Sequence, residues 1–352
     1  MRSDLERILT AANQAPSGEN CQPWHFVVRG STVEVHLLAD RDRSAYSWGE
    51  RASYLAIGAA IENLVIAASA EHYRAPVRYF PDPENRFHTA TVTLVSEPSL
   101  AIDPLVPAIA ERATNRKPYD KKPLSKADAS ALAGAAKEAD LVLVAEREKI
   151  ERLGRVGSTN EEIMLANHGL HRFFFDHVNW TKEEDEEKKI GFYIKTLELP
   201  PPARAMFRVM QHWPIMRALA TLGMNRVVAV QNGATNASAA AIGAVLIDSI
   251  EPVDFIRAGR TVERVWLTAT ARGLSVQPLT GVLFFKLMID GGDGAKIFSA
   301  AERSLVQKAY EEAAELVDAR GKHIAFMFRV GKGDAPSARA IRFPLEQAVT
   351  VV

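Results

Sequence analysis

The sequence predicts an α+β fold of the α/β-sandwich kind, and three observations lead to it. Residues 51–70 read RASYLAIGAAIENLVIAASA, a segment that is apolar on nearly every face, as in a helix buried on all sides. Residues 26–38 alternate apolar and polar side chains around Arg29-Gly30-Ser31, which is the pattern of a β-hairpin. A strand-like segment at 241–247 and a long apolar helix at 254–272 repeat this combination later in the chain.

The composition is that of a globular chain without a polyanionic partner. The chain is 47% hydrophobic and 24% charged. Its length of 352 residues allows two core-forming units or one large unit. Lys+Arg and Asp+Glu number 43 each, so no net field would attract nucleic acid or an anionic membrane. We therefore expect a small-molecule substrate, with neither nucleic acid nor a membrane as partner.

The expected location is the cytoplasm. The chain opens with MRSDLER, which carries charges and no apolar stretch, so we expect no signal peptide. The single cysteine, Cys21, excludes an intrachain disulfide and a Cys-rich zinc site, and fits a reducing compartment. The most apolar long window, residues 227–250, contains amide and acidic side chains, so we expect no membrane span.

Residues 1–105 are expected to form the first half of the fold. Leu5, Ile8, Leu9 and Ala12 recur at helical spacing, because these positions lie on one face of a helix. In order, we predict a helix over 3–13, a polar loop, strands at 26–28 and 33–38, the buried helix over 51–70, and a strand over 89–95.

Residues 106–352 are expected to form the second half. Apolar segments of strand length and helix length alternate through most of it. In order, we predict a helix over 126–137, a strand over 140–144, a helix over 147–167, a strand over 241–247, a helix over 254–272, a turn over 273–281, a helix over 300–318 and a strand over 323–330.

Residues 168–225 interrupt this regular alternation. The segment joins an aromatic cluster, Phe173–Phe175, to the charge run TKEEDEEKK and then to three consecutive prolines. A connection this long inside a compact domain is usually a lid, a binding loop or a disordered insert. We interpret it as a lid whose apolar underside includes the phenylalanine cluster, and the charge run as a solvated helix face.

Residues 15–26, APSGENCQPWHF, are predicted to be a loop that turns into a strand. Pro16 and Gly18 punctuate the loop, and Ser17 and Asn20 add short polar side chains. Backbone N–H groups, a hydroxyl and amides in one short segment suit the edge of a planar polar ligand better than a metal or a covalent reaction. The alternative is a polar turn that merely precedes a core strand.

The stretch APSGENCQPW closely resembles the flavin-contacting APS-x-x-N-x-QPW signature of the nitroreductase-like FMN oxidoreductases. The resemblance covers most of the chain outside 168–225, and it is greatest to the long two-repeat subgroup related to mycobacterial Acg proteins. It implies a nitroreductase-like fold that is internally duplicated, so that one chain mimics the family homodimer with its flavin at the subunit interface. The monomer would act as an internal dimer, and further dimerisation stays open.

The resemblance also places the cofactor-binding residues. The family's Arg-x-Ser-x-Arg segment, which holds the flavin phosphate and pyrimidine edge, is present only in the second half, as RATNR at 112–116. Guanidinium groups match a phosphate bidentately, and the threonine keeps the serine hydroxyl. The signature loop lies only in the first half, so one FMN site is implied rather than two. The residues assigned to it are Pro16, Ser17, Asn20, Gln22, Arg112, Thr114, Arg116, Thr280, Gly281 and Arg339, with Arg329 and Arg342 as further candidates.

No catalytic side chain is implied, because FMN supplies the redox chemistry itself. The turn Pro278-Leu279-Thr280-Gly281 aligns with the family's Pro-x-Glu-Gly turn, whose backbone N–H meets flavin N5. The backbone of Thr280 and Gly281 keeps this donor, but the carboxylate near N5 is lost.

Two other groups of residues offer weaker chemistry. Cys21 lies inside the signature, but a thiol nucleophile needs a lowered pKa, so we interpret it as loop packing. His168, His171 and His177 lack a carboxylate motif such as H-E-x-x-H, so we expect no metal site there.

The leading hypothesis is an FMN-dependent oxidoreductase. NAD(P)H would reduce the flavin, and a small planar acceptor of the nitroaromatic or quinone type would take the reducing equivalents. Two alternatives remain: a non-enzymatic flavin-sequestering protein with a closed lid, and a flavin-free degenerate scaffold.

Overall fold

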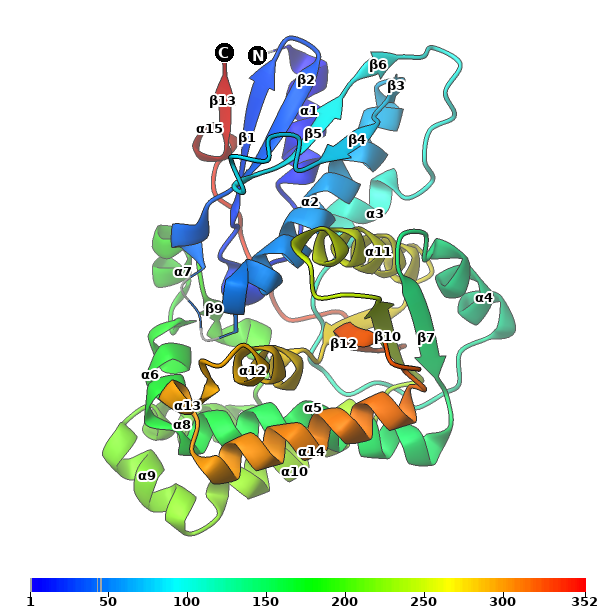
Figure 1. Cartoon of the computed structure of the whole chain (residues 1–352). Coiled ribbons are helices and arrows are strands. Elements are labelled where there is room, and N and C mark those ends of the chain that lie inside the picture. Colours follow the sequence, from blue (N-terminus) through cyan, green and yellow to red (C-terminus); the bar gives the residue numbers. More distant parts are fainter. Residues whose placement is uncertain (1, 43, 45) are drawn as a thin grey trace.

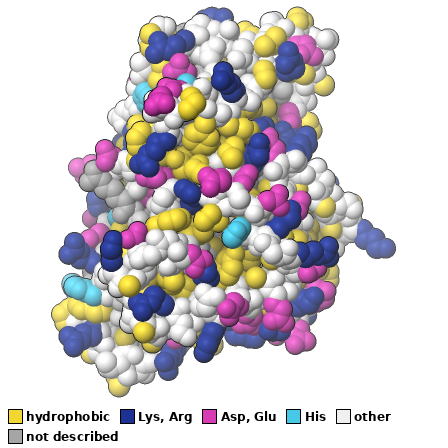
Figure 2. All heavy atoms as spheres, in the orientation of Figure 1, with side chains coloured by type: hydrophobic (Ala, Val, Ile, Leu, Met, Phe, Trp, Pro, Cys, Tyr) yellow, Lys and Arg dark blue, Asp and Glu magenta, His cyan; other side chains and the backbone are white. Residues whose placement is uncertain are grey.

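The computed structural model describes residues 2–42, 44 and 46–352, and its two larger β-sheets have a pair of helices packed between them (Figure 1). The mixed α+β class predicted from the sequence is confirmed. Charges of both signs are interspersed over the face shown in Figure 2, as their balanced numbers lead one to expect.

The first sheet has the order β13-β1-β2-β5-β4. Its inward face buries Trp24, Phe26, Val33 and Val35, which alternate with half-exposed residues. All its pairs are antiparallel except that between β1 and β13, so the end of the chain joins the sheet of the first half. The strands are β1 (Trp24–Arg29), β2 (Thr32–Leu37), β4 (Val77–Tyr79), β5 (His88–Thr93) and β13 (Val349–Val351).

The second sheet has the order β11-β12-β10-β7 and is antiparallel throughout. All seven residues of β10 are buried, because helices cover both faces of this sheet. The strands are β7 (Asp140–Val144), β10 (Ala241–Ile247), β11 (Ser275–Pro278) and β12 (His323–Gly331). The predicted strands at 140–144 and 241–247 are confirmed.

The helices α2 (Arg51–Ala70) and α11 (Pro252–Ala271) pack against each other between the sheets. Gly58 and Gly259 lie at their crossing, where an added Cβ on Gly58 would stand only 2.9 Å from the Cα of Gly259. Glycine is required there because the two backbones touch. Beside the crossing, the buried Glu62 of α2 pairs with Arg260 at 2.8 Å and with Arg264.

One segment, Trp48–Ala70, is long and apolar enough to span a membrane by length and composition alone. In the structure 89% of its most apolar window is buried inside the protein, where α2 contacts α11. The segment therefore serves as a core helix.

The remaining helices surround this core. The insert predicted at 168–225 is largely helical and lies with α10 at one end of the molecule, beside α5 (Figure 1). The helices are α1 (Ser3–Ala12), α3 (Val106–Glu111), α4 (Lys126–Ala135), α5 (Arg147–Ala166), α6 (His168–Asp176), α7 (Lys182–Lys188), α8 (Pro201–Met210), α9 (Trp213–Thr221), α10 (Met224–Asn236), α12 (Gly281–Asp290), α13 (Gly294–Ile297), α14 (Ala300–Leu316) and α15 (Leu345–Ala348). Short strand pairs join β3 (Tyr73–Arg74) to β6 (Val95–Ser96) and β8 (Val178–Asn179) to β9 (Phe192–Tyr193).

Candidate functional site

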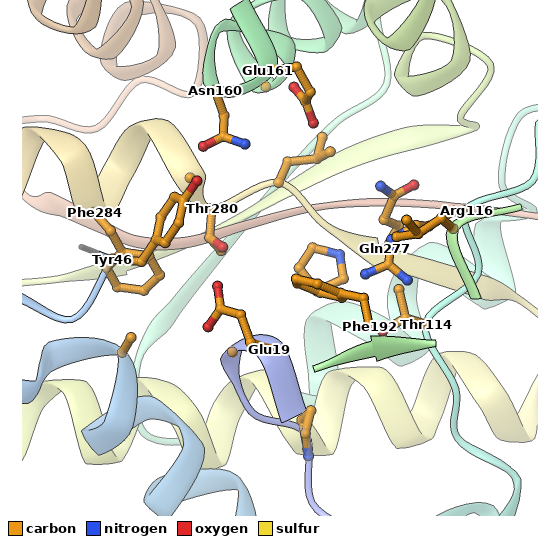
Figure 3. Close-up of a pocket in the computed structure, with 18 of the residues that line it drawn as sticks. Glu19, Tyr46, Thr114, Arg116, Asn160, Glu161, Phe192, Gln277, Thr280 and Phe284 are labelled. Carbon is orange, nitrogen blue, oxygen red and sulfur yellow. The ribbon is translucent and has the colours of Figure 1, made fainter. Parts of the chain in front are cut away.

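A cavity of about 400 Å³ lies between the loop at 16–19, helices α2 and α5, the insert, and the turn at 277–281. Most of its lining is apolar, and Figure 3 shows the labelled polar side chains in three groups, one of which is Asn160 with Glu161. Glu19, Tyr46 and Thr280 lie together at one end, and Thr114, Arg116 and Gln277 at the other. Such a space suits a flat apolar ligand with polar edges.

A second, smaller recess of about 120 Å³ continues the cavity at its arginine end. The two spaces share lining from the signature loop, the 112–116 segment and β9, through Pro16, Ser17, Thr114, Arg116 and Phe192. The recess adds Asn20, Arg112, Arg339 and Arg342, and none of the described residues that line it is acidic. Cavity and recess together fit an elongated ligand with a flat body and an anionic end.

The signature loop holds a strained backbone. Glu19, Asn20 and Gln22 have φ values of 44°, 56° and 51°, which non-glycine residues adopt at a cost. The amide of Asn20 donates to the carbonyls of Lys189 and Ile341, both at 2.8 Å. Gln22 donates to Lys189 at 2.9 Å and accepts from the N–H of Phe343 at 2.8 Å. The insert and the C-terminal segment therefore fix this conformation.

Of the predicted loop residues, Pro16 and Ser17 line both spaces and Asn20 lines the recess. Gln22 is fully buried behind the loop and lines neither, so its role is to support the loop. The hydroxyl of Ser17 accepts from the N–H of Gln22 at 2.9 Å, which places it within the same hydrogen-bond network.

The 112–116 segment is positioned by the second sheet. Thr114 forms a parallel bridge with Val276 of β11, and the N–H of Asn115 donates to the carbonyl of Val276 at 3.0 Å. The amide of Asn115 donates to Ser275 at 2.8 Å and to the carbonyl of Asp334 at 2.7 Å. This pairing brings Thr114 and Gln277 to the same wall of the cavity.

Arg112 is a buried charge with a buried partner. Its Nε lies 3.1 Å from Oε1 of Glu263, its Nη2 donates to the carbonyl of Gln14 at 2.8 Å, and its guanidinium lies over Trp266 at 4.8 Å. Burial lowers the pKa of Arg112 and raises that of Glu263 to about 7, although each charge stabilises the other.

The other arginines of the recess crowd positive charge around it. Arg116 donates to the carbonyl of Thr196 at 3.0 Å, and burial lowers its pKa to about 10. Arg342 donates to Asn20 Oδ1 at 2.8 Å, and burial together with nearby Arg112 lowers its pKa to about 9. Arg339 is exposed and donates to the carbonyl of Ala110 at 2.7 Å.

The polar groups of this recess suit a phosphate. Among the described residues the buried Nε atom of Arg342 has no hydrogen-bond partner, and burial, to which a neighbouring arginine charge adds in each case, lowers the pKa values of Arg112 and Arg342. A bound anion with several acceptor oxygens would satisfy both. Arg342, only a secondary candidate from the sequence, is therefore as well placed as the predicted Arg112, Arg116 and Arg339.

Arg329, the other secondary candidate, lies elsewhere. It is fully buried, donates to Gln277 at 2.7 Å and to the carbonyls of Lys117 and Thr235 at 2.8 and 2.9 Å, and lies over Tyr119 at 4.0 Å. It lines neither space, so its role is structural.

The cavity also carries two acidic groups that the sequence did not single out. Glu19 points toward Thr280 from the signature loop, and Glu161 comes from α5 on the far side (Figure 3). Burial, with nearby Asp42, raises the pKa of Glu19 to about 8, and burial raises that of Glu161 to about 7. One oxygen of Glu161 and the oxygen of Asn160 are buried and have no hydrogen-bond partner within the described part of the chain.

The predicted turn at 278–281 also lines the cavity. Thr280 and Gly281 line the cavity, and α12 begins at Gly281. The first N–H groups of a helix have no partner within it, so the turn offers backbone donors here. Gly281 is required because a Cβ would overlap the side chain of Asn160.

The insert supplies much of the cavity lining. Five of its residues line the cavity, namely Phe174, Phe192, Leu197, Leu199 and Phe207, and its role as a lid stays a prediction. Of the three clustered phenylalanines, Phe174 lines the cavity. Phe173 packs in a tilted arrangement against His177, with ring centroids 4.2 Å apart, and Phe175 packs in the same way against Phe207 at 4.8 Å.

The cysteine and the histidines that the sequence analysis considered as weaker candidates for chemistry have structural roles. Cys21 is buried, and desolvation raises its pKa well above the ordinary value, the opposite of an activated thiol. A ring nitrogen of His171 lies 2.8 Å from the carbonyl of Met210, and one of His177 lies 2.7 Å from that of Phe173. His168 is exposed and stacks on Trp213 at 4.7 Å.

No model of a known protein family matches the chain. The chain is 26% identical over 336 residues to an uncharacterized Mycobacterium tuberculosis protein. The aligned region covers 94% of this chain and 46% of that protein. It is 28% identical over 289 residues to the protein named "Putative NAD(P)H nitroreductase Rv3131" of the same organism, covering 78% of this chain and 76% of that protein. The chain thus spans less than half the length of the first relative. Among solved structures, a nitroreductase with bound FMN from Bacteroides fragilis gives a TM-score of 0.37 at 13% identity, covering 71% of this chain and 99% of that one.

Proposed function

We propose that this chain, which belongs to the nitroreductase-like family, binds one FMN and passes reducing equivalents from NAD(P)H to a small planar acceptor of the nitroaromatic or quinone type. The observation that carries the proposal is the continuity of a mostly apolar cavity with an arginine-lined recess, at the loop that carries the family signature. The relatives named as NAD(P)H nitroreductases support the same activity.

The residues present would hold the cofactor by its two chemically different ends. Arg112, Arg116, Arg339 and Arg342 would bind the phosphate, and Ser17 and Thr114 would contribute hydroxyls where recess and cavity meet. The ring system would lie in the cavity against the backbone of the turn at 278–281. FMN, when bound, supplies hydride and electron transfer.

The protein's own contribution is orientation, exclusion of water and a proton. The phenylalanines and leucines of the insert close one side of the cavity. Glu19 retains its proton at neutral pH, because burial raises its pKa to about 8, and its carboxyl faces the cavity beside Thr280. A reduced acceptor needs protons, so Glu19 can donate one at the position where the aligned turn has lost its glutamate.

An internal duplication accounts for the single site. The sequences LAIGAAIEN at 55–63 and IRAGRTVER at 256–264 share a glycine followed four residues later by a glutamate. The two glycines meet at the crossing of α2 and α11, as equivalent residues do on a two-fold axis. In this proposal residues 1–105 and 106–352 are the diverged halves, β13 returns to the first half, and the monomer supplies both sides of the site. The cytoplasmic location stays a prediction from the sequence.

The second candidate is a protein that sequesters flavin without turnover. The insert's contribution to the cavity wall favours it, since a closed lid would retain the cofactor and obstruct the acceptor. This candidate predicts bound FMN with negligible oxidation of NAD(P)H.

The test is the visible absorbance spectrum of the purified protein, incubated with FMN and recorded before and after anaerobic addition of NADPH or NADH. A protein-bound flavin band that bleaches supports the enzyme, and catalytic oxidation of NAD(P)H with menadione completes the evidence. A bound band that does not bleach favours sequestration. No bound flavin after incubation refutes both.

A further inference from the structure

The outer face of the first sheet carries two histidines and a glutamate in mutual reach. Among the described residues, Glu34, His36 and His88 place one possible ligand atom each within 4.8 Å of the others. Oε2 of Glu34 lies 3.1 Å from Nε2 of His36, and the rings of His36 and His88 stack with centroids 4.6 Å apart. Figure 2 shows histidine and acidic side chains close together near the top of the view, where Figure 1 places this sheet.

The strand geometry brings these residues together. Glu34 and His36 are two residues apart on β2 and therefore point to the same face of the sheet. His36 stands directly opposite His88 of β5 in the strand register. Cross-strand partners have Cβ atoms about 4.5–5.5 Å apart, which allows two imidazoles to share one ion.

A β-bulge is what turns His88 outward. The register between β2 and β5 shifts at Val35 and His36, so that Val35 faces Ala90 while His36 faces His88. Thr89 and Ala90 are both buried in succession, which breaks the strict alternation of the strand. Without the extra residue, His88 would point into the core. Bulges of this kind re-aim side chains at functional positions.

We propose that Glu34, His36 and His88 form a binding site for a divalent transition-metal ion, with Zn²⁺ as the best fit. Two imidazoles and one carboxylate are ligands that Zn²⁺ accepts, leaving a fourth position for water or another group. Mg²⁺ prefers oxygen ligands in octahedral geometry and does not suit this set. The spacing of these residues along the sequence gives no hint of the site, because the bulge and the strand pairing create it.

Hydrogen bonds from neighbouring side chains orient the proposed ligands. Oε1 of Glu34 accepts from Arg29 at 3.0 Å, which fixes the carboxylate and leaves its other oxygen directed at His36. A ring nitrogen of His88 contacts the hydroxyl of Thr91 at 3.0 Å, and such partners orient metal-binding imidazoles. None of the three proposed ligands lines the flavin cavity or the recess, so the site is independent of the proposed function.

The experiment is a calorimetric titration of the tag-free, chelator-treated full chain with Zn²⁺, with Mg²⁺ in a parallel titration. One equivalent of Zn²⁺ should bind, and Mg²⁺ should not. His36→Ala and His88→Ala should each weaken Zn²⁺ binding by more than about 100-fold, since losing even an outer partner of a ligand costs about 10–100-fold. His323→Ala, at an exposed position on β12, should bind like the wild type.

Absence of stoichiometric Zn²⁺ binding overturns the proposal, and so does binding that survives both histidine substitutions. Circular dichroism of each variant shows whether the first sheet remains folded. If a variant does not fold, the visible spectrum of the wild type loaded with Co²⁺ decides: intense bands of a four-coordinate ion support the site, and the weak bands of aqueous Co²⁺ refute it.

Discussion

Replacing Glu19 by glutamine should stabilise the FMN-free protein, and the gain should increase with pH. Glu19 lies in the cavity with no positive partner among the residues that the structure describes, and burial together with Asp42 raises its pKa from 4.5 to about 8. A carboxyl whose folded pKa is above its unfolded pKa is held protonated by the fold. The folded protein therefore loses stability as pH rises from the unfolded value through the folded value. Glutamine is nearly isosteric and has no charge to bury.

The size of the effect follows from the shift. Each pKa unit corresponds to about 1.4 kcal/mol, so a group shifted from 4.5 to about 8 would cost the fold up to about 3 kcal/mol at pH 7 and about 1 kcal/mol at pH 5. Glu19 is partly accessible to solvent, which screens the charge, so we expect a measured gain of about 1–3 kcal/mol at pH 7. The gain should level off above about pH 8, where wild-type Glu19 is ionised in both states.

The assay is urea unfolding of both proteins at pH 5, 7 and 8.5, followed by tryptophan fluorescence. Glu84→Gln is the matched control, because Glu84 is exposed and the same chemical change there should alter stability little at any pH. A difference between wild type and Glu19→Gln that is constant across pH, or that decreases as pH rises, would refute the account of Glu19 as a protonated cavity group.

Three other predictions test separate parts of the structure. Gly259→Ala should lower the unfolding free energy by about 1–3 kcal/mol or more, because a Cβ would overlap the backbone of α2, whereas Gly134→Ala on an open helix face should be neutral or stabilising by up to about 1 kcal/mol. Arg339→Ala should weaken FMN binding by about 10–100-fold in a fluorescence titration, because one charge-assisted contact is lost. The control Arg172→Ala, at an exposed position on α6, should leave FMN binding unchanged. Cys21 should react with a thiol reagent only when the protein unfolds; rapid reaction of the native protein would contradict its burial and raised pKa.

Much of the fold could be predicted because its signals are local. The helix over 51–70 and the strands at 140–144 and 241–247 have the predicted bounds. Each is a continuous apolar segment, so its pattern hardly depends on what packs against it. The signature loop could likewise be placed at a site, because Pro16, Ser17 and Asn20 all reach the cavity or the recess.

The parts that could not be predicted depend on contacts distant in sequence. The strand β13 pairs with β1 from the other end of the chain, and no local pattern reveals that partner. Arg342 enters the recess because Asn20 and the carbonyl of Ala15 hold its guanidinium, whereas in the sequence it is one arginine among several near the C-terminus. Glu161 lies on an amphipathic helix whose cavity-facing side can be identified only once the insert is in place.

The proposed duplication makes Glu62 and Glu263 equivalent residues, and the structure gives them different partners. Glu62 on α2 pairs with Arg260 and Arg264 of α11, inside the helix crossing. In the alignment of the two repeats, the residues at those arginine positions on α2 are Ala59 and Asn63, which carry no charge.

Glu263, the counterpart on α11, therefore lacks a cationic partner at those positions and pairs instead with Arg112 of the recess. A buried carboxylate needs a partner, and with uncharged residues at both positions on α2 Glu263 pairs with Arg112, which lines the recess. In the first half, two arginines of the core already neutralise the corresponding glutamate. That glutamate therefore positions no further arginine at a ligand site. Under the proposed duplication, divergence at two positions of one helix would account for one cofactor site being kept while the other became packing.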